Sequence, residues 1–272
     1  MKSIKLRSGN EMPLLGLGTW RLSGKQCTDS VAAALETGYR HIDTADAYEN
    51  HKDIAKALAK SSLNREQLFI TSKIWRDRLH FDQITADTER FLDELGVQYL
   101  DLLLIHWPNA DIPLKESLKA LKEVKNSGLI RDVGVSNFTI NHLKDAVEYY
   151  PDLITLNQVE FHPSLYQKEL LEFCRKNDIA LTAYSPLGRG ADFDSDVIEE
   201  LSQKYDKKPA QLILKWLIDK DIAAIPKASS KSHLEENFEV FGWDFPEEAR
   251  IKMDQLNRDN RIIDPGFGEF DY

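Results

Sequence analysis

The segment YLDLLLIHWPNADIPLKESLKALKEVKNSGLIRDVGV (residues 99–135) places a predicted helix between two predicted strands. Its two apolar runs, Tyr99–Ile105 and Ile130–Val135, are short and continuous, which is typical of strands buried on both faces of a parallel sheet. Between them, Leu114–Lys125 carries leucines and a valine at three- and four-residue spacing, which predicts an amphipathic helix. Gly128 follows that helix, where a left-handed residue commonly ends one. The segment therefore predicts one strand–helix–strand unit of a parallel α/β fold.

The same alternation runs along the whole chain. Further apolar runs are found at Leu14–Leu17, His41–Asp43, Leu68–Ser72, Leu153–Val159, Ile179–Tyr184 and Ile222–Ile225. Further helical segments are found at Gln26–Thr37, Phe81–Leu95, Asn141–Tyr149, Lys168–Asn177 and Pro209–Lys220. Eight such units over this length predict a (β/α)8 TIM barrel. The segment Ser3–Pro13 reads as a β-hairpin that precedes the barrel and closes its bottom.

An open, doubly wound sheet is the alternative fold for this alternation. That fold usually carries G-x-G-x-x-G after its first strand, but here Gly16 and Gly18 are followed by Arg21 in the third position. The fingerprint therefore fails, and the barrel is favoured. No linker or change of composition divides the chain, so we expect residues 1–272 to form a single domain.

The composition limits the classes of partner. The chain has 272 residues, with 35 Lys and Arg against 45 Asp and Glu, and so a formal net charge of −10. This sign disfavours a nucleic acid or a membrane surface as partner. The two cysteines, Cys27 and Cys174, form no C-x-x-C motif and fit a reducing compartment. We expect a cytoplasmic protein, monomeric, with no membrane or nucleic-acid partner and no bound metal.

Polar residues follow successive strands of the predicted barrel, where barrel enzymes place their chemistry. Asp43, Lys73 and His106 end three neighbouring strands, and Tyr48 lies a few residues beyond the first. Taken singly, each of these residues could have a purely structural role, such as a helix cap for Asp43 or a surface position for Lys73. Together they form a proton-donating device, because a nearby ammonium lowers the pKa of a phenol from about 10. Such a device protonates an alkoxide as it forms, as carbonyl reduction requires.

With these residues in view, the chain resembles the aldo-keto reductase family along nearly its whole length. The matching blocks are GYRHIDTADAYEN (Gly38–Asn50), TSKIW (Thr71–Trp75), LLLIHWP (Leu102–Pro108), VGVSNF (Val133–Phe138), LNQVEFHP (Leu156–Pro163), AYSPLGRG (Ala183–Gly190) and IPKASSKSHLEENF (Ile225–Phe238). The resemblance implies a barrel that transfers a hydride from NADPH to a small aldehyde or ketone without a metal.

The resemblance also implies roles for individual residues. Tyr48 would be the general acid, assisted by Lys73 and Asp43, and His106 would orient the carbonyl. The cofactor would be held by Ser136, Asn137, Gln158, Tyr184, Ser185, Leu187, Lys227, Ser229, His233, Glu236 and Asn237. The substrate pocket would be walled by Trp20, Trp75 and Trp107, an apolar surface suited to uncharged carbonyl compounds.

Several positions depart from the family pattern. Ala228 stands where serine is common, and His233 stands where an arginine usually grips the adenosine 2′-phosphate. We therefore expect NADPH to be preferred less strongly than in members with the arginine, and NADH also to be accepted. A short loop after Pro108 and a short C-terminal tail predict an open pocket with broad preference. The sequence leaves open whether Phe267, Phe270 and Tyr272 cover the cofactor or extend away from it.

The sequence disfavours three other functions. A non-catalytic, nucleotide-sensing member of the same fold would have no reason to keep Tyr48, Lys73 and Asp43 together. A Schiff-base aldolase using Lys73 would need that amine unprotonated, which a neighbouring aspartate opposes. Metal-dependent hydrolysis could draw on His106, His162 and Asp43, but the seven histidines form no H-x-x-x-H pair.

Overall fold

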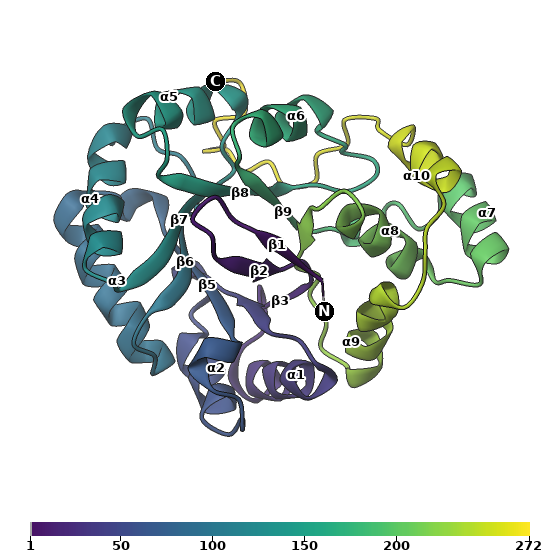
Figure 1. Cartoon of the computed structure of the whole chain (residues 1–272), viewed down its shortest axis with the longest axis horizontal. Helices are drawn as coiled ribbons and strands as arrows, with labels where there is room; N and C mark the ends of the chain where they lie inside the picture. The colour runs from purple at the N-terminus through teal and green to yellow at the C-terminus, as the bar shows by residue number, and fades with distance from the viewer. Residues whose placement is uncertain (1) are drawn as a thin grey trace.

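Eight parallel strands form a barrel in the computed structural model, which describes residues 2–272 (Figure 1). They are β3 (Gly16–Gly18), β4 (His41–Asp43), β5 (Phe69–Ile74), β6 (Leu100–Ile105), β7 (Ile130–Ser136), β8 (Ile154–Glu160), β9 (Ala180–Tyr184) and β10 (Ala223–Ala224). Each strand pairs with the next, and a bridge between Leu15 and Ala224 joins the last to the first. The predicted TIM barrel is confirmed, and each predicted apolar run overlaps a strand.

The first barrel strand, β3, contains two glycines and lies close to its neighbours. A Cβ atom on Gly18 would lie 2.5 Å from the carbonyl oxygen of Ile225, so only glycine allows β3 to approach the last strand this closely. The amide of Gly18 also donates to the carbonyl of Pro226 at 3.2 Å. The barrel therefore closes through backbone contacts at a position where no side chain fits.

The predicted hairpin is also confirmed. Strands β1 (Ser3–Lys5) and β2 (Glu11–Pro13) pair antiparallel and lie across one end of the barrel, in front of it in Figure 1. Met12 is fully buried beneath the hairpin, and Asn10 donates to Asp132 at 2.7 Å. The amino-terminal end of the barrel is thus closed by packed side chains, which leaves the opposite end for a site.

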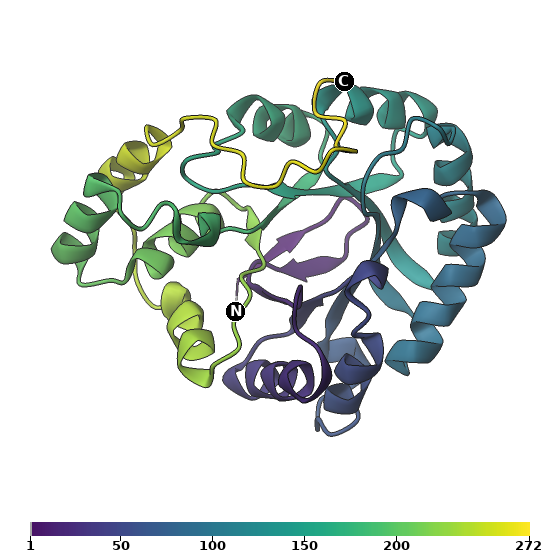
Figure 2. The ribbon, with the colours of Figure 1, turned by 180° about the vertical axis from the view of Figure 1, so that it is seen from behind.

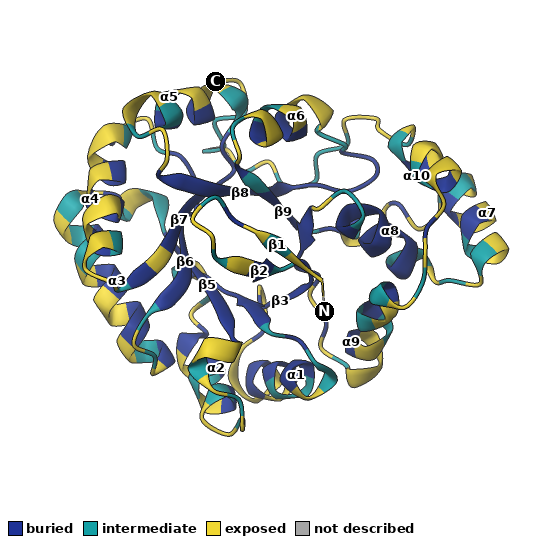
Figure 3. Ribbon diagram, viewed as in Figure 1, coloured by how far each residue is buried: buried dark blue, intermediate teal, exposed yellow. Residues whose placement is uncertain are grey.

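Ten helices ring the barrel in the described part of the chain. They are α1 (Gly24–Thr37), α2 (His51–Leu58), α3 (Phe81–Leu95), α4 (Leu114–Asn126), α5 (Ile140–Tyr149), α6 (Lys168–Lys176), α7 (Asp196–Tyr205), α8 (Pro209–Ile218), α9 (Lys231–Phe238) and α10 (Glu247–Asp254). None of them, within residues 2–272, has both the length and the apolarity that crossing a membrane takes. The buried faces of the outer helices point at the strands, which are almost wholly buried (Figure 3).

Candidate active site

A buried ion pair lies at the carboxyl ends of β4 and β5. Lys73 is fully buried, and its Nζ donates to Asp43 Oδ1 at 2.5 Å and to the carbonyl of Thr44 at 2.8 Å. The hydroxyl of Tyr48, on the short 3-10 turn Asp46–Tyr48 after β4, lies 3.4 Å from the same Nζ. The structure therefore brings Asp43, Lys73 and Tyr48 together, as the sequence predicted.

The second carboxylate oxygen of Asp43 is satisfied from across the barrel. Gln158, on β8, donates its side-chain amide to Asp43 Oδ2 at 2.7 Å. The carboxylate thus accepts charged and neutral donors on its two oxygens, which is what a fully buried charge requires. Sequence reasoning placed both residues at the rim but gave no sign that they touch.

The pKa of Tyr48 moves opposite to the sequence-based expectation. Burial raises this pKa well above its usual value of 10, and the charge of Asp43 raises it further. The net lowering expected from Lys73 is therefore wrong for the protein by itself, because burial and the charge of Asp43 dominate the shift. Burial also lowers the pKa of Lys73, and Asp43 opposes that shift. The phenol is thus held firmly in its protonated form.

His106, at the end of β6, completes the cluster. Its ring meets those of Tyr48 and Trp75 edge to face, with centroids 5.8 and 5.4 Å away. Burial lowers the pKa of His106 well below 6.5, and the nearby charge of Lys73 lowers it further. Its Nδ1 is buried, and none of residues 2–272 offers it a hydrogen-bond partner. A neutral imidazole in this position leaves Nε2 as the nitrogen that can donate to a molecule in the pocket.

A pocket of about 420 Å³ opens above these groups. It is lined by Gly18, Thr19, Trp20, Asp43, Ala47, Tyr48, Trp75, His106, Trp107, Asn137, Gln158, Tyr184, Ser185, Arg189, Ile225, Lys227 and Ile263. The three predicted tryptophans are all present, with Trp20 at 39% exposure forming the outer wall. Sequence reasoning missed five of the lining side chains, because none of them stands out by type or spacing; they are Thr19, Ala47, Arg189, Ile225 and Ile263.

The residues expected to hold a nicotinamide form a hydrogen-bonded chain beside the pocket. The hydroxyl of Tyr184 donates to Asn137 Oδ1 at 2.7 Å, and the Asn137 amide donates to the carbonyl of His106 at 2.9 Å. Ser136 does not line the pocket; its hydroxyl donates to the carbonyl of Gln158 at 2.8 Å. These hydrogen bonds fix the ring of Tyr184 at the pocket wall.

Of the residues expected toward the adenosine end, Lys227 lines this pocket, and the others lie outside it. Ser229 and His233 are exposed at the start of α9, and Glu236 pairs with Lys208 on the neighbouring α8. Asn237 is buried beside Tyr39. Leu187 is half-buried and packs against the core. The structure therefore groups the predicted cofactor residues into a pocket set and a separate set along α9.

The C-terminal tail folds over the barrel mouth, which Figure 2 shows from the open side. The ring of Phe267 packs on Trp75 and Trp107, with centroids 5.7 and 5.4 Å away. The hydroxyl of Tyr272 donates to Asp145 at 2.6 Å. Of the two arrangements left open by the sequence, the structure shows the folded one, and the tail supplies one wall of the pocket.

Comparison with known proteins adds to this geometry. Residues 14–258 match the model of the aldo/keto reductase family. The chain is 40% identical to a glyoxal reductase of Bacillus subtilis (strain 168), over 96% of this chain and 94% of that protein. It is also 40% identical to a methylglyoxal reductase of Escherichia coli (strain K12), over 93% of this chain and 90% of that one. A crystal structure of a Bombyx mori aldo-keto reductase in complex with NADP superposes with a TM-score of 0.90 at 32% identity, covering 97% of this chain and 95% of that one.

Proposed function

The chain belongs to the aldo/keto reductase family, and from that premise we propose that it reduces small aldehydes and ketones with NADPH, using Tyr48 as the general acid. The observation that carries the proposal is the buried cluster at the pocket floor, where the Tyr48 hydroxyl lies 3.4 Å from Lys73 Nζ. A binding module of the same fold would gain nothing from a charged pair buried beneath its ligand, since burying two charges is costly.

The pocket would hold the nicotinamide end of an extended dinucleotide, whose adenosine end would lie outside it beside α9. Tyr184 offers an aromatic face at the centre, and Ser185, Arg189 and Lys227 continue the wall outward. Within residues 2–272 neither Arg189 nor Lys227 forms an ion pair, so both cations are available to phosphate groups. A bound NADPH would supply the hydride. The Bombyx mori relative was crystallised with NADP, which supports the same cofactor here.

The protein's own groups then manage the substrate oxygen. The lowered pKa of His106 keeps its imidazole neutral. Its N–H would donate to the carbonyl oxygen of the substrate and so orient that group. As the carbonyl carbon gains the hydride, its oxygen becomes an alkoxide, and Tyr48 transfers the hydroxyl proton to it. An alkoxide is a stronger base than a phenolate, so a phenol with a raised pKa can still protonate it. The buried ammonium of Lys73 stabilises the phenolate that remains.

The pocket favours small, uncharged carbonyl compounds. Trp20, Trp75 and Trp107 supply its apolar walls, and the similar proteins named above are reductases of glyoxal and methylglyoxal. We infer that α-dicarbonyls and related short aldehydes are substrates. The exposed His233 in place of a phosphate-gripping arginine supports use of NADH as a second, weaker cofactor.

The test is an assay of NADPH oxidation with methylglyoxal, glyoxal and a panel of simple aldehydes. We expect turnover with NADPH and a lower kcat/KM with NADH. Binding of NADPH without oxidation, across the whole panel, would instead favour the nucleotide-sensing alternative. A preference for NADPH of many thousandfold would contradict the inference from His233. As a shape control, Trp20→Ala should alter the ranking of the aldehydes more than the turnover of methylglyoxal, the smallest ketone on the panel.

A further inference from the structure

A second buried charged cluster lies at the carboxyl end of β8, outside the pocket. His162 is fully buried, with its Nε2 2.9 Å from Glu160 Oε1 and its Nδ1 3.1 Å from Asp192 Oδ2. Glu160 and Asp192 are themselves buried. The hydroxyl of Ser164 also lies 3.1 Å from Nδ1. Two carboxylates on the two ring nitrogens call for hydrogen on both, which only the imidazolium provides.

The charges around His162 agree with this form. Burial alone lowers the pKa of His162, but the hydrogen bonds and charges of Asp192 and Glu160 outweigh burial and raise it. The same contacts lower the pKa of Glu160 and of Asp192, against burial. Tyr184, on β9, lies near Glu160: burial raises the pKa of Tyr184, the charge of Glu160 raises it further, and Arg261, on the C-terminal tail, opposes this shift. The cluster is therefore an ionised triad.

One end of the triad holds the C-terminal tail. The two oxygens of Glu160 accept the backbone amides of Ile262 at 2.7 Å and Ile263 at 2.8 Å. The carbonyl of Ser164 accepts two more tail amides, those of Arg258 and Asn260, at 3.2 and 3.0 Å. Because Ile263 lines the pocket, the position of this pocket wall depends on Glu160.

The other end of the triad holds the loop between β9 and α7 (residues 185–195). Asp192 belongs to this loop, and a Cβ atom on Gly188 would lie 2.7 Å from its Oδ2 and 3.3 Å from His162 Nδ1. Gly188 has φ +53°, so glycine here serves both the backbone conformation and the close approach. The same loop carries Ser185 and Arg189 to the pocket.

We propose that His162 is a positioning residue that couples the loop 185–195 to the C-terminal tail through Asp192 and Glu160. His162 does not line the pocket, and it acts on the reaction only through the two segments that it joins. The proposal rests on the proposed function in one respect, namely that the loop holds the cofactor and the tail contacts the substrate.

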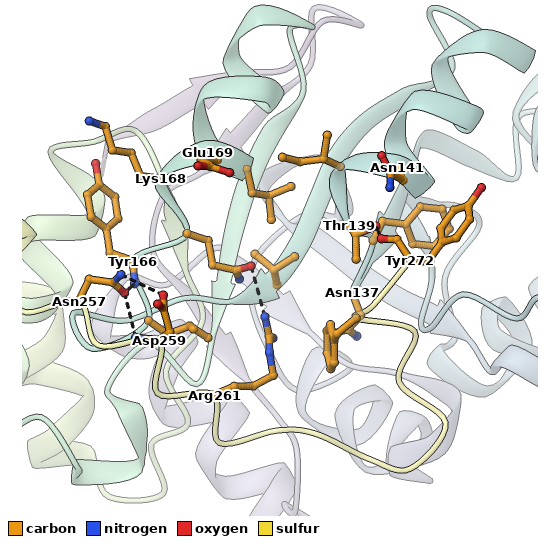
Figure 4. A pocket seen from close by; sticks show the side chains of 17 residues that line it. Asn137, Thr139, Asn141, Tyr166, Lys168, Glu169, Asn257, Asp259, Arg261 and Tyr272 are labelled. Atoms are coloured by element: carbon orange, nitrogen blue, oxygen red, sulfur yellow. Dashed lines mark hydrogen bonds between the residues drawn. The ribbon is translucent and has the colours of Figure 1, made fainter.

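The space beside the tail gives this coupling a consequence. A cavity of about 720 Å³ lies between the tail and the starts of α5 and α6 (Figure 4). Few side-chain bonds cross it. Arg261 donates to Gln167 at 3.4 Å, and Asn257 accepts the amide of Tyr166 at 2.8 Å. A tail released from Glu160 has room to move into this cavity, and Ile263 would move with it.

The test separates coupling from local structure by cutting the triad at the end far from the tail. In Asp192→Asn, His162 loses a carboxylate and becomes neutral. Glu160 then lacks the cation that keeps its pKa low, and the carboxyl that takes up a proton binds the tail amides less tightly. Hydrogen–deuterium exchange at Ile262 and Ile263 should accelerate by about tenfold or more, the value of one charge-assisted hydrogen bond. Asp194→Asn is the matched control, because Asp194 is exposed in the same loop. It should leave tail exchange unchanged.

A kinetic measurement complements the exchange. Asp192→Asn should raise the KM for NADPH and the KM for the carbonyl substrate by severalfold each, with kcat changed much less. Asp194→Asn should change neither. If Asp192→Asn does not fold, Gly188→Ala presses a methyl group against the same contact without removing a charge, and the same acceleration in the tail is expected.

The exchange measurement needs no turnover, so it stands even if the wild type reduces no carbonyl compound, an outcome that would contradict only the proposed function. Wild-type rates of exchange at Ile262 and Ile263 in both Asp192→Asn and Gly188→Ala would overturn the coupling.

Discussion

Two buried histidines at the same rim of the barrel differ in charge: one is neutral and the other is an imidazolium. His106 ends β6 beside the ammonium of Lys73, while His162 follows β8 between two carboxylates. Burial lowers the pKa of both, so burial does not explain the difference. The neighbours decide the sign of the net shift: the ammonium of Lys73 favours the neutral form of His106, and two carboxylates favour the charged form of His162. Under the two proposals above, the first site performs the chemistry and the second positions the segments around it.

The largest effect should come from the chemical part. Tyr48→Phe removes only the acidic proton, so kcat should fall by about 10²–10⁴-fold, the usual contribution of a general acid. Binding of NADPH should be nearly unchanged, because the cofactor residues lie elsewhere. Steady-state kinetics together with fluorescence titration of NADPH measures both. Near-normal turnover would show that Tyr48 is not the general acid. The difference between the two histidine sites would then no longer separate a chemical site from a positioning site.

The two histidine sites should rank in the reverse order by their contribution to the free energy of unfolding. His162→Gln leaves two buried carboxylates without their cation and should lower the free energy of unfolding by about 3–5 kcal/mol. His106→Gln replaces a neutral ring that has no hydrogen-bond partner on Nδ1 and should cost about 1 kcal/mol or less. Urea unfolding of both variants beside the wild type tests this. Equal losses would mean that the charge states of the two histidines do not differ.

The pH dependence of stability should sharpen the contrast. The raised pKa of His162 contributes stability that is fully present below about pH 6.5 and is lost as the pH rises through the folded-state value. The lowered pKa values of Glu160 and Asp192 contribute stability above about pH 4 that is lost on further acidification.

The gap in unfolding free energy between wild type and His162→Gln should therefore be widest between about pH 4 and 6.5. The lowered pKa of His106 acts oppositely: it costs the wild type stability below about pH 6.5, and His106→Gln should escape that cost. Unfolding curves across this range check both signs. A gap that widened for His162→Gln above pH 7 would contradict the charged form.

The smallest effect is expected at a third histidine that belongs to neither site. His233 is exposed at the start of α9, and His233→Arg should raise the preference for NADPH over NADH by about fivefold. Exposed ion pairs contribute about 1 kcal/mol or less, which sets this limit. Ratios of kcat/KM for the two cofactors measure it, and His233→Gln serves as the uncharged control. An equal rise in both variants would show that charge is not the cause.

Much of the fold could be predicted from local pattern. Phe81–Leu95 and His41–Asp43 were predicted with the bounds that the structure shows, because strong periodicity and a short buried strand are local signals. The predicted helices omitted α2, α7, α9 and α10, three of which have only eight residues. Over two turns, a helical period barely differs from chance.

The grouping of Asp43, Lys73 and His106 followed from topology alone, since parallel strands end at one rim. What could not be predicted depends on contacts between distant segments. The bond from Gln158 to Asp43, the triad around His162 and the tail wall at Ile263 each join residues with no sequence pattern in common. The direction of the Tyr48 pKa depends on burial, which no spacing reveals.

Ile263 lines the pocket, and Phe267 packs on two of its tryptophans; both belong to a stretch of chain that contributes no strand to the sheet. Grafting a different ending onto residue 257 would thus leave the strand pairing and the proton donor as they are, while presenting a new surface to the incoming aldehyde. Under the proposed function, substrate preference is therefore expected to change with the sequence of the tail while the residues at the strand ends stay the same.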